Sequence, residues 1–569
     1  MRQSVVAGAG EAGPQESVRR AWWPGRARAL SGTLTGLAAL LVLGALVLPD
    51  SVDRLGPAAF VRVPAEAVVG AVLLPALPRR PRMAVAAGSG VLLAALTVLN
   101  ALDMGFRQYL GRTFDVVLDW SLLGDAKSYL EDSLGTTVAL VAVAGTIALI
   151  LLLFVLLALS MVRLTELLAR HPAAAHRGAS TAAVAWVACA SLGLQPAAVP
   201  LASHRTVTAL RDRAHRVSET LRDEAEFRKV ARADAFGTTP GDRLVPGLRG
   251  KDVIFTFVES YGRSAIEDPG IAPGVGRMLD ARTKALARAG FHARSGWLTS
   301  ATYGGSSWLG HSTTMSGLWI SNQQRYRTVM ASDRLSLTEA FRKTGAFETV
   351  GVMPGVRKSW PEQKWYGLDK VYDAFGLGYR GPRFSWSTMP DQYALQQYQE
   401  RVHGKRPAAG KGRLSLLILT SSHQPWAPVP RMVDWDRLGD GSAFRAMEAT
   451  GSKAADVIAD TAKSRAEYGR SIRYSVTALT EWLERYGTKD TVLVFLGDHQ
   501  PIARVSGTHA SRDVPVSLVA KDPGLLDRID GWHWTDGLRP ARDAPVWKMS
   551  AFRDRFLTAY GSTPGPGRN

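Results

Sequence analysis

Four apolar stretches in the first third of this chain carry no charged side chain. They cover residues 29–49, 83–102, 134–162 and 179–203. A helix needs about 20 apolar residues to cross the hydrocarbon core of a bilayer. Each stretch has that length, so the sequence predicts an N-terminal all-α transmembrane part, residues 1–203, rather than a soluble domain.

A fifth apolar stretch, residues 55–78, contains Arg62 and Glu66. These two lie four residues apart, on one helix face where their charges can neutralise each other, so we expect a fifth span here. Arginines precede the first span and follow the second and the fourth, whereas residues 103–132 carry six acidic and three basic side chains. This asymmetry predicts a multi-pass plasma-membrane protein in which everything after Ser203 is extracytoplasmic.

The net charge is +19 and the sequence pI is about 10.1. The basic residues are dispersed or flank apolar runs, with no basic helix and no aromatic-basic repeat, so we expect no nucleic-acid partner. Anionic lipid headgroups explain the excess positive charge better. Cys189 is the single cysteine, which excludes a disulfide within the chain and a cysteine-rich metal cluster.

The remaining sequence is predicted to hold a juxtamembrane linker helix in residues 204–250 and a catalytic domain in residues 251–560. Short apolar runs typical of buried strands alternate there with amphipathic helical patterns, which favours an α/β domain with a central, mostly parallel sheet. The predicted strands are Val253–Val258, Phe347–Met353, Leu414–Leu419, Val492–Leu496 and Val514–Val519, and the predicted helices are Val275–Ala289, Ser336–Lys343 and Glu467–Tyr486.

Polar residues follow three of these strands at their carboxyl ends, where open α/β sheets bind ligands. Glu259 follows the first strand, Asp498 and His499 follow the fourth, and His423 comes shortly after the third. Any one of them alone is compatible with an ordinary turn or helix cap. Together, carboxylate oxygens and an imidazole nitrogen form a ligand set for a divalent cation such as Zn, Mn or Mg.

A glycine turn before a helical pattern offers a nucleophile in Ser306 or Ser307. A hydroxyl at a helix N-terminus meets a phosphate that backbone N–H groups and the helix dipole already attract. The alternative is that either serine simply caps the helix. His311 lies one turn further along and can handle leaving-group protons or pack in the core.

These motifs, in this order, resemble the alkaline phosphatase/sulfatase superfamily, in particular its membrane branch with lipoteichoic acid synthases and phosphoglycerol or phosphoethanolamine transferases. The resemblance covers nearly the whole chain. It implies that Glu259, the nucleophile, Asp498 and His499 bind the metal ion. It also implies that His423 contacts the phosphate or the lipid headgroup, and that His509 is a further site histidine.

Spacing to Gly317, ten residues downstream, favours Ser307 over Ser306 as the family's nucleophile position. Serine departs from the threonine of lipoteichoic acid synthases. Trp360 matches a headgroup-contacting tryptophan of the synthases, but Glu362 stands where they carry an arginine, which puts phosphatidylglycerol specificity in doubt. The segment after Ser307 lacks the Pro and Arg of sulfatases.

The resemblance implies a metal-dependent phosphotransferase. We expect it to move a phospholipid-headgroup phosphoryl ester to an envelope glycan or lipid acceptor through a phosphoserine intermediate. One alternative is a phosphodiesterase or sulfatase-like hydrolase that uses the same site with water. Another is a membrane sensor without catalysis, which would need a broken ligand set.

Overall fold

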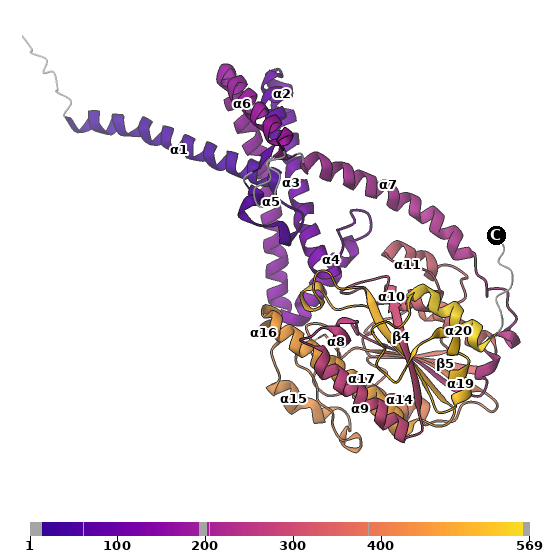
Figure 1. Ribbon diagram of the computed structural model, residues 1–569. Coiled ribbons are helices and arrows are strands. Elements are labelled where there is room, and N and C mark those ends of the chain that lie inside the picture. Colours follow the sequence, from indigo (N-terminus) through magenta and orange to yellow (C-terminus); the bar gives the residue numbers. More distant parts are fainter. Residues whose placement is uncertain (1–13, 61, 193–201, 204, 385, 562–569) are drawn as a thin grey trace, which may run out of the picture. The chain divides into compact units, whose positions relative to one another are not determined.

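A computed structural model describes residues 14–60, 62–192, 202–203, 205–384 and 386–561 (Figure 1). The chain divides into two compact units. The first comprises Met1–Met104 and Ala142–His215, and the second comprises Gly105–Val141 and Arg216–Asn569.

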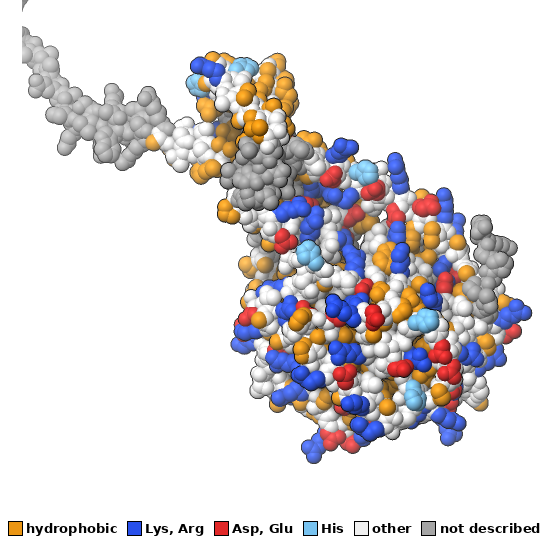
Figure 2. All heavy atoms as spheres, viewed as in Figure 1, with side chains coloured by type: hydrophobic (Ala, Val, Ile, Leu, Met, Phe, Trp, Pro, Cys, Tyr) orange, Lys and Arg blue, Asp and Glu red, His pale blue; other side chains and the backbone are white. Residues whose placement is uncertain are grey.

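The first unit is helical. Among the described residues of the chain, three helices are long and apolar enough to cross a membrane: Ala29–Val47 within α1, and the whole of α3 and α5. Hydrophobic side chains gather on the surface of this unit, whereas acidic and basic side chains are mixed over the second (Figure 2). The helices are α1 (Pro14–Val47), α2 (Ala65–Ala76), α3 (Arg79–Leu110), α5 (Thr136–Arg170) and α6 (Pro172–Ser191).

The two weaker spans differ from the expectation. Residues 55–78 do not form one helix, because α2 has only 12 residues and contains Pro75. Such a helix is about 18 Å long, short of the roughly 30 Å of a bilayer core. In the last predicted span, α6 ends at Ser191, and residues 193–201 lie outside the described residues. Five full-length spans are therefore not confirmed.

The second unit is built on a nine-stranded sheet, with α7 (Arg205–Arg232) leading into it. The strand order is β10-β4-β9-β8-β3-β7-β5-β6, and β11 pairs with β4. Strands β8, β3, β7, β5 and β6 are parallel, while β9 is antiparallel to both of its neighbours. The bounds are β3 (Asp252–Val258), β4 (His292–Thr299), β5 (Phe347–Met353), β6 (Lys370–Asp373), β7 (Gly412–Leu419), β8 (Thr491–Gly497), β9 (Asp513–Ala520), β10 (Thr535–Asp536) and β11 (Val546–Lys548).

Helices cover both faces of this sheet (Figure 1). One face packs against α9 (Ala272–Arg288), α14 (Asp391–Tyr398) and α17 (Thr461–Tyr486). The other packs against α10 (Ser307–Ser316), α12 (Leu337–Lys343) and α20 (Phe552–Tyr560). Burial on both faces explains why the central strands are almost continuously apolar.

The five predicted strands and three predicted helices are confirmed, with bounds shifted by a few residues. Strand β4 was missed because its sequence, His-Ala-Arg-Ser-Gly-Trp-Leu-Thr, is half polar. Its buried Ser295 is satisfied across the sheet by the Ser517 hydroxyl at 2.7 Å. A polar residue in a strand needs such a partner, and sequence pattern does not reveal it.

Candidate metal centre and nucleophile

Strand β3 lies between β7 and β8, and all three run parallel. Their register places Val258 opposite both Leu419 and Gly497. Glu259 and Asp498, the next residues along β3 and β8, therefore leave neighbouring strands at the same level. Parallel strands in register deliver these two side chains to one edge of the sheet.

Glu259, Asp498 and His499 form a compact, buried group. Each offers a ligand atom, and these atoms all lie within 4.8 Å of one another. Nε2 of His499 is 3.3 Å from Oε1 of Glu259. Backbone N–H groups of Ser260 and His499 donate to Oδ1 of Asp498 at 2.7 and 2.8 Å, which fixes that carboxylate.

The other oxygen of the Asp498 carboxylate, Oδ2, is buried and accepts no hydrogen bond from any described residue. Nε2 of His311 lies 3.4 Å from this oxygen and also forms no hydrogen bond with any described residue. A buried carboxylate oxygen without a donor is costly. A divalent cation would satisfy it, so Glu259, Asp498 and His499 fit a metal ion.

Nearby charges shift the pKa values of two side chains in this group, His499 and Glu259. Burial opposes protonation of His499, but the carboxylates of Asp498 and Glu259 outweigh burial and raise its pKa to about 9. Burial likewise opposes ionisation of Glu259, yet the hydrogen bond from His499 and the nearby histidines hold its pKa well below the ordinary value. Glu259 is therefore held as an anion, the form that binds cations.

Ser307 contacts this group directly. Its Oγ is 2.9 Å from Oε2 of Glu259 and 3.1 Å from Nε2 of His499. Ser306 precedes it at the N-cap of α10 with φ 60°, and its side chain makes no capping bond. The structure thus brings Ser307, rather than Ser306, into contact with the ligand set.

His423 lies on the loop after β7 and stacks on Trp386, with ring centroids 3.8 Å apart and planes 13° apart. Its Nδ1 is 2.6 Å from the carbonyl oxygen of Gln424. Since a carbonyl only accepts, Nδ1 carries the proton and Nε2 has a free lone pair in the neutral ring. Burial lowers the pKa of His423 despite the opposing charge of Glu259, which favours that neutral ring.

The two remaining predicted substrate residues are Trp360 and His509. Trp360 is half-buried and packs on Tyr366, with centroids 5.1 Å apart, beside the core on the α10 face. His509 is exposed in the turn after α18 (Ala503–Ser506). No contact in the described part of the chain joins either to Glu259 or Ser307, and their roles stay predictions.

Several residues that support the site were not predicted from the sequence. The Ser422 hydroxyl donates to the carbonyl of Glu259 at 2.6 Å, and the Ser300 hydroxyl donates to the carbonyl of Asp498 at 2.6 Å. Asp391 accepts the backbone N–H groups of Thr420 and Ser421. These are isolated polar residues in sequence, with no spacing that signals their role.

No family model matches the chain, and no curated protein matches it by sequence. Solved structures do match, distantly. The chain is similar to the lipoteichoic acid synthase LtaP from Listeria monocytogenes, at 13% identity and TM-score 0.38, over 60% of this chain and 78% of that one. It is similar to the phosphoglycerol transferase GacH from Streptococcus pyogenes, at 12% identity and TM-score 0.36, over 60% and 83%.

A third match is the C-terminal periplasmic domain of EptC from Escherichia coli, at 12% identity and TM-score 0.36, over 55% of this chain and 83% of that one. Another solved structure that matches is named as a protein of the alkaline phosphatase superfamily, from Vibrio parahaemolyticus.

Proposed function

We propose that this chain is a membrane-bound, metal-dependent phosphotransferase of the alkaline phosphatase superfamily. The observation that carries the proposal is the contact of the Ser307 hydroxyl with both Glu259 and His499, at the ends of adjacent parallel strands. A hydroxyl placed against metal-binding side chains at a helix N-terminus is arranged for attack on a phosphoryl group.

Glu259, Asp498, His499 and Ser307 would hold a divalent cation. When bound, the cation lowers the pKa of the serine hydroxyl and offsets negative charge on the phosphoryl oxygens. The donor set suits Zn, Mn or Mg.

The reaction we propose has two displacements. Oγ of Ser307 attacks the phosphorus of a phospholipid-headgroup diester, forming a serine–phosphorus bond as the bond to the departing alcohol breaks. The proton of the serine hydroxyl ends on the departing alkoxide, so this step gives a phosphoserine diester and a free alcohol. An envelope glycan or lipid hydroxyl then attacks phosphorus and releases Ser307.

His423 is suited to the second displacement. Its neutral ring presents an unprotonated Nε2, and the preceding residue, Ser422, ties this loop to the backbone of Glu259. We propose that this nitrogen accepts the proton of the incoming hydroxyl. Trp386, stacked on the ring, keeps its orientation.

The charged side chains of residues 103–132 support an extracytoplasmic position for the catalytic residues. Residues 105–141, from the end of α3 to the start of α5, belong to the same compact unit as Glu259 and Ser307, which supports a position for both on one side of the membrane. Residues 103–132 carry six acidic and three basic side chains, which favours the extracytoplasmic side. In this topology α5 leaves that side, and the chain must return to it before the strands of the sheet.

The test uses the full chain in nanodiscs that contain headgroup-labelled phosphatidylglycerol or phosphatidylethanolamine, with a divalent metal added. Wild type should release or transfer label. Ser307→Ala should lower turnover about a thousandfold or more, whereas Ser306→Ala should stay within about threefold. Equal turnover in wild type and Ser307→Ala would refute the mechanism.

The acceptor is decided in the same assay. Label on a lipid or glycan acceptor supports the transferase. Label released only as free headgroup phosphate in the presence of such acceptors supports the alternative, a phosphodiester hydrolase with water as acceptor.

A further inference from the structure

The second unit contains a pocket of about 300 Å³ beside the nucleophile turn. One wall is the segment that follows α3, including Arg112 and Asp119. Another wall is Ala301–Tyr303, which leads directly into the glycine turn before Ser307. Arg216 of α7 and Arg512, just before β9, complete the lining.

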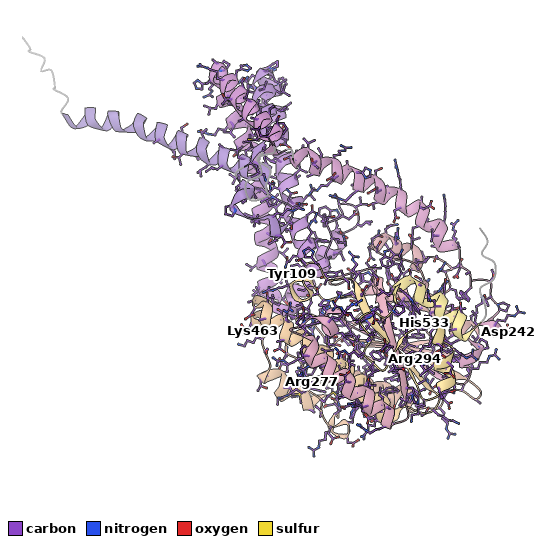
Figure 3. All side chains as sticks on the ribbon, in the orientation of Figure 1. Tyr109, Asp242, Arg277, Arg294, Lys463 and His533 are labelled. Carbon is purple, nitrogen blue, oxygen red and sulfur yellow. The ribbon has the colours of Figure 1, made fainter. Side chains whose placement is uncertain are left out.

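The end of α3 and the segment that follows it pack closely against the turn that leads to Ser307. Gly304 has φ +71°, and a Cβ there would lie 1.8 Å from the carbonyl oxygen of Tyr109. A Cβ on Gly111 would lie 3.0 Å from the ring of Tyr303. Tyr109, labelled in Figure 3, lies in the last turn of α3. A Cβ would not fit at Gly304, and Gly111 also has a positive φ, so this close approach depends on glycine and the pocket borders the turn that presents Ser307.

The positive charges of this pocket are unequally neutralised. Arg112 is bound by both carboxylate oxygens of the buried Asp119, one of them at 2.8 Å. Arg512 donates only to the carbonyl oxygen of Ala301, at 3.2 Å. Arg216 forms no hydrogen bond or ion pair with any residue that the structure describes. Two guanidinium groups thus line the pocket without a carboxylate partner.

The other acid of the pocket does not supply the missing partner. The Asp115 carboxylate accepts the Thr220 hydroxyl at 3.0 Å and two backbone N–H groups of its own turn. Burial lowers the pKa of Arg512, and the neighbouring charge of Arg112 lowers it further. An anion bound beside Arg512 would offset the repulsion between the guanidinium groups of Arg112 and Arg512.

We propose that this pocket is a second phosphate-binding site, in which Arg216 and Arg512 bind the oxygens of a phosphate monoester or diester. Guanidinium groups match phosphate geometry through paired, charge-assisted hydrogen bonds. The phosphate belongs to a membrane lipid headgroup or to a free phosphate ester. The site does not depend on Ser307 acting as the nucleophile.

The test measures how fast phenylglyoxal modifies single arginines of the full chain, read by peptide mass spectrometry. The protein is held in phosphatidylcholine nanodiscs, with or without glycerol 3-phosphate, and in nanodiscs that also contain phosphatidylglycerol. Arg222 is the internal control, since it lies on the same helix, α7, and is exposed outside the pocket.

Modification of Arg216 and Arg512 should slow about tenfold when the site is filled, while Arg222 stays unchanged. Protection by glycerol 3-phosphate identifies a free phosphate ester, and protection by phosphatidylglycerol alone identifies the lipid headgroup. Arg512→Gln should abolish the protection of Arg216, and Arg222→Gln should leave it intact.

Two results would overturn the site. One is an unchanged rate at Arg216 under every condition. The other is equal slowing at Arg216 and Arg222, which would reflect general shielding by anions. If Arg512→Gln fails to fold, Arg512→Lys replaces it and should weaken the protection, because lysine keeps the charge but not the paired donors.

Discussion

Nε2 of His311 lies 3.4 Å from Oδ2 of Asp498, although one side chain belongs to α10 and the other follows β8. The same helix carries Ser307, so α10 presents two polar groups to the ligand set at once. Its approach is possible because residue 310 is glycine: a Cβ there would lie 2.6 Å from the carbonyl oxygen of Asp498.

Gly310→Ala is therefore expected to push α10 away from the end of β8. Overpacking at this contact should cost about 1–3 kcal/mol of stability and lower turnover about tenfold or more, because Ser307 moves with the helix. Thermal unfolding and phosphodiester turnover measure the two effects.

The matched control is Gly531→Ala, in the same unit, where a Cβ would meet no atom within 4 Å. It should leave turnover and stability near those of wild type. Wild-type turnover in Gly310→Ala would show that the close contact of α10 is dispensable.

Removal of the divalent metal should lower stability as well as activity. Without a cation, Oδ2 of Asp498 stays buried without a hydrogen bond from any described residue. A ligand at a hundred times its Kd stabilises the folded state by about 2.7 kcal/mol, so chelation should lower the melting temperature by a few degrees. Calorimetry before and after chelation, with metal restored at the end, measures this shift.

In Asp498→Asn, chelation should no longer shift the melting temperature, because the ligand set is broken. An equal shift in wild type and in this variant would place the metal outside Glu259, Asp498 and His499.

The sequence predicts the part of the site that strand ends determine. Glu259, Asp498 and His499 follow apolar runs whose length and composition identify buried parallel strands, and the topology then brings them together. The full strand order was not needed for that inference. It required only that β3 and β8 run parallel in one sheet, because their carboxyl ends then lie at the same edge. The contact of Ser307 required the fold, because α10 is 48 residues from Glu259.

What the sequence does not reveal depends on partners that are distant along the chain. Trp386 stacks on His423, and Asp391 ties the loop after β7, yet each is an isolated residue in its own segment. The apolar composition of residues 55–78 suggested a span, but Pro64 precedes α2 and Pro75 lies in its last turn, and the helix stays short.

A buried ion pair on the face of the sheet covered by α20 makes a stability prediction. Both carboxylate oxygens of Asp234 accept from Arg553, at 2.8 and 3.1 Å, and Arg553 is fully buried. Asp234→Asn leaves that guanidinium without its buried charge partner, so we expect a loss of about 3 kcal/mol. Asp554→Asn is the control. Its carboxylate also contacts Arg553 but is 42% exposed, so it should cost below about 1 kcal/mol.

The difference in stability between wild type and Asp234→Asn should depend on pH. Burial opposes ionisation of Asp234, but Arg553 and Arg334 lower its pKa below 3.8. A carboxyl group with a lowered pKa stabilises the folded state above its unfolded pKa, and this stabilisation disappears as pH falls through the folded value. The gap between wild type and Asp234→Asn should thus be full near neutral pH and shrink below 3.8. Unfolding midpoints across pH measure it, and a constant gap would contradict the ion-pair origin.

Asp391, the first residue of α14, should position His423 without binding metal. Its Oδ1 accepts the backbone N–H groups of Thr420 and Ser421 at 2.7 and 3.0 Å, and its Oδ2 accepts the Ser475 hydroxyl at 2.6 Å. Asp391→Ala leaves two buried N–H groups unpaired, at about 1–3 kcal/mol each, and frees the loop that carries His423. Turnover should fall about tenfold or more while bound metal stays stoichiometric, because Asp391 holds neither Glu259 nor Asp498.

Ser475→Ala removes one donor and keeps both loop bonds, so it should retain turnover within about threefold. Loss of metal in Asp391→Ala, or an equal loss of turnover in Ser475→Ala, would show that this carboxylate supports the whole domain rather than the loop.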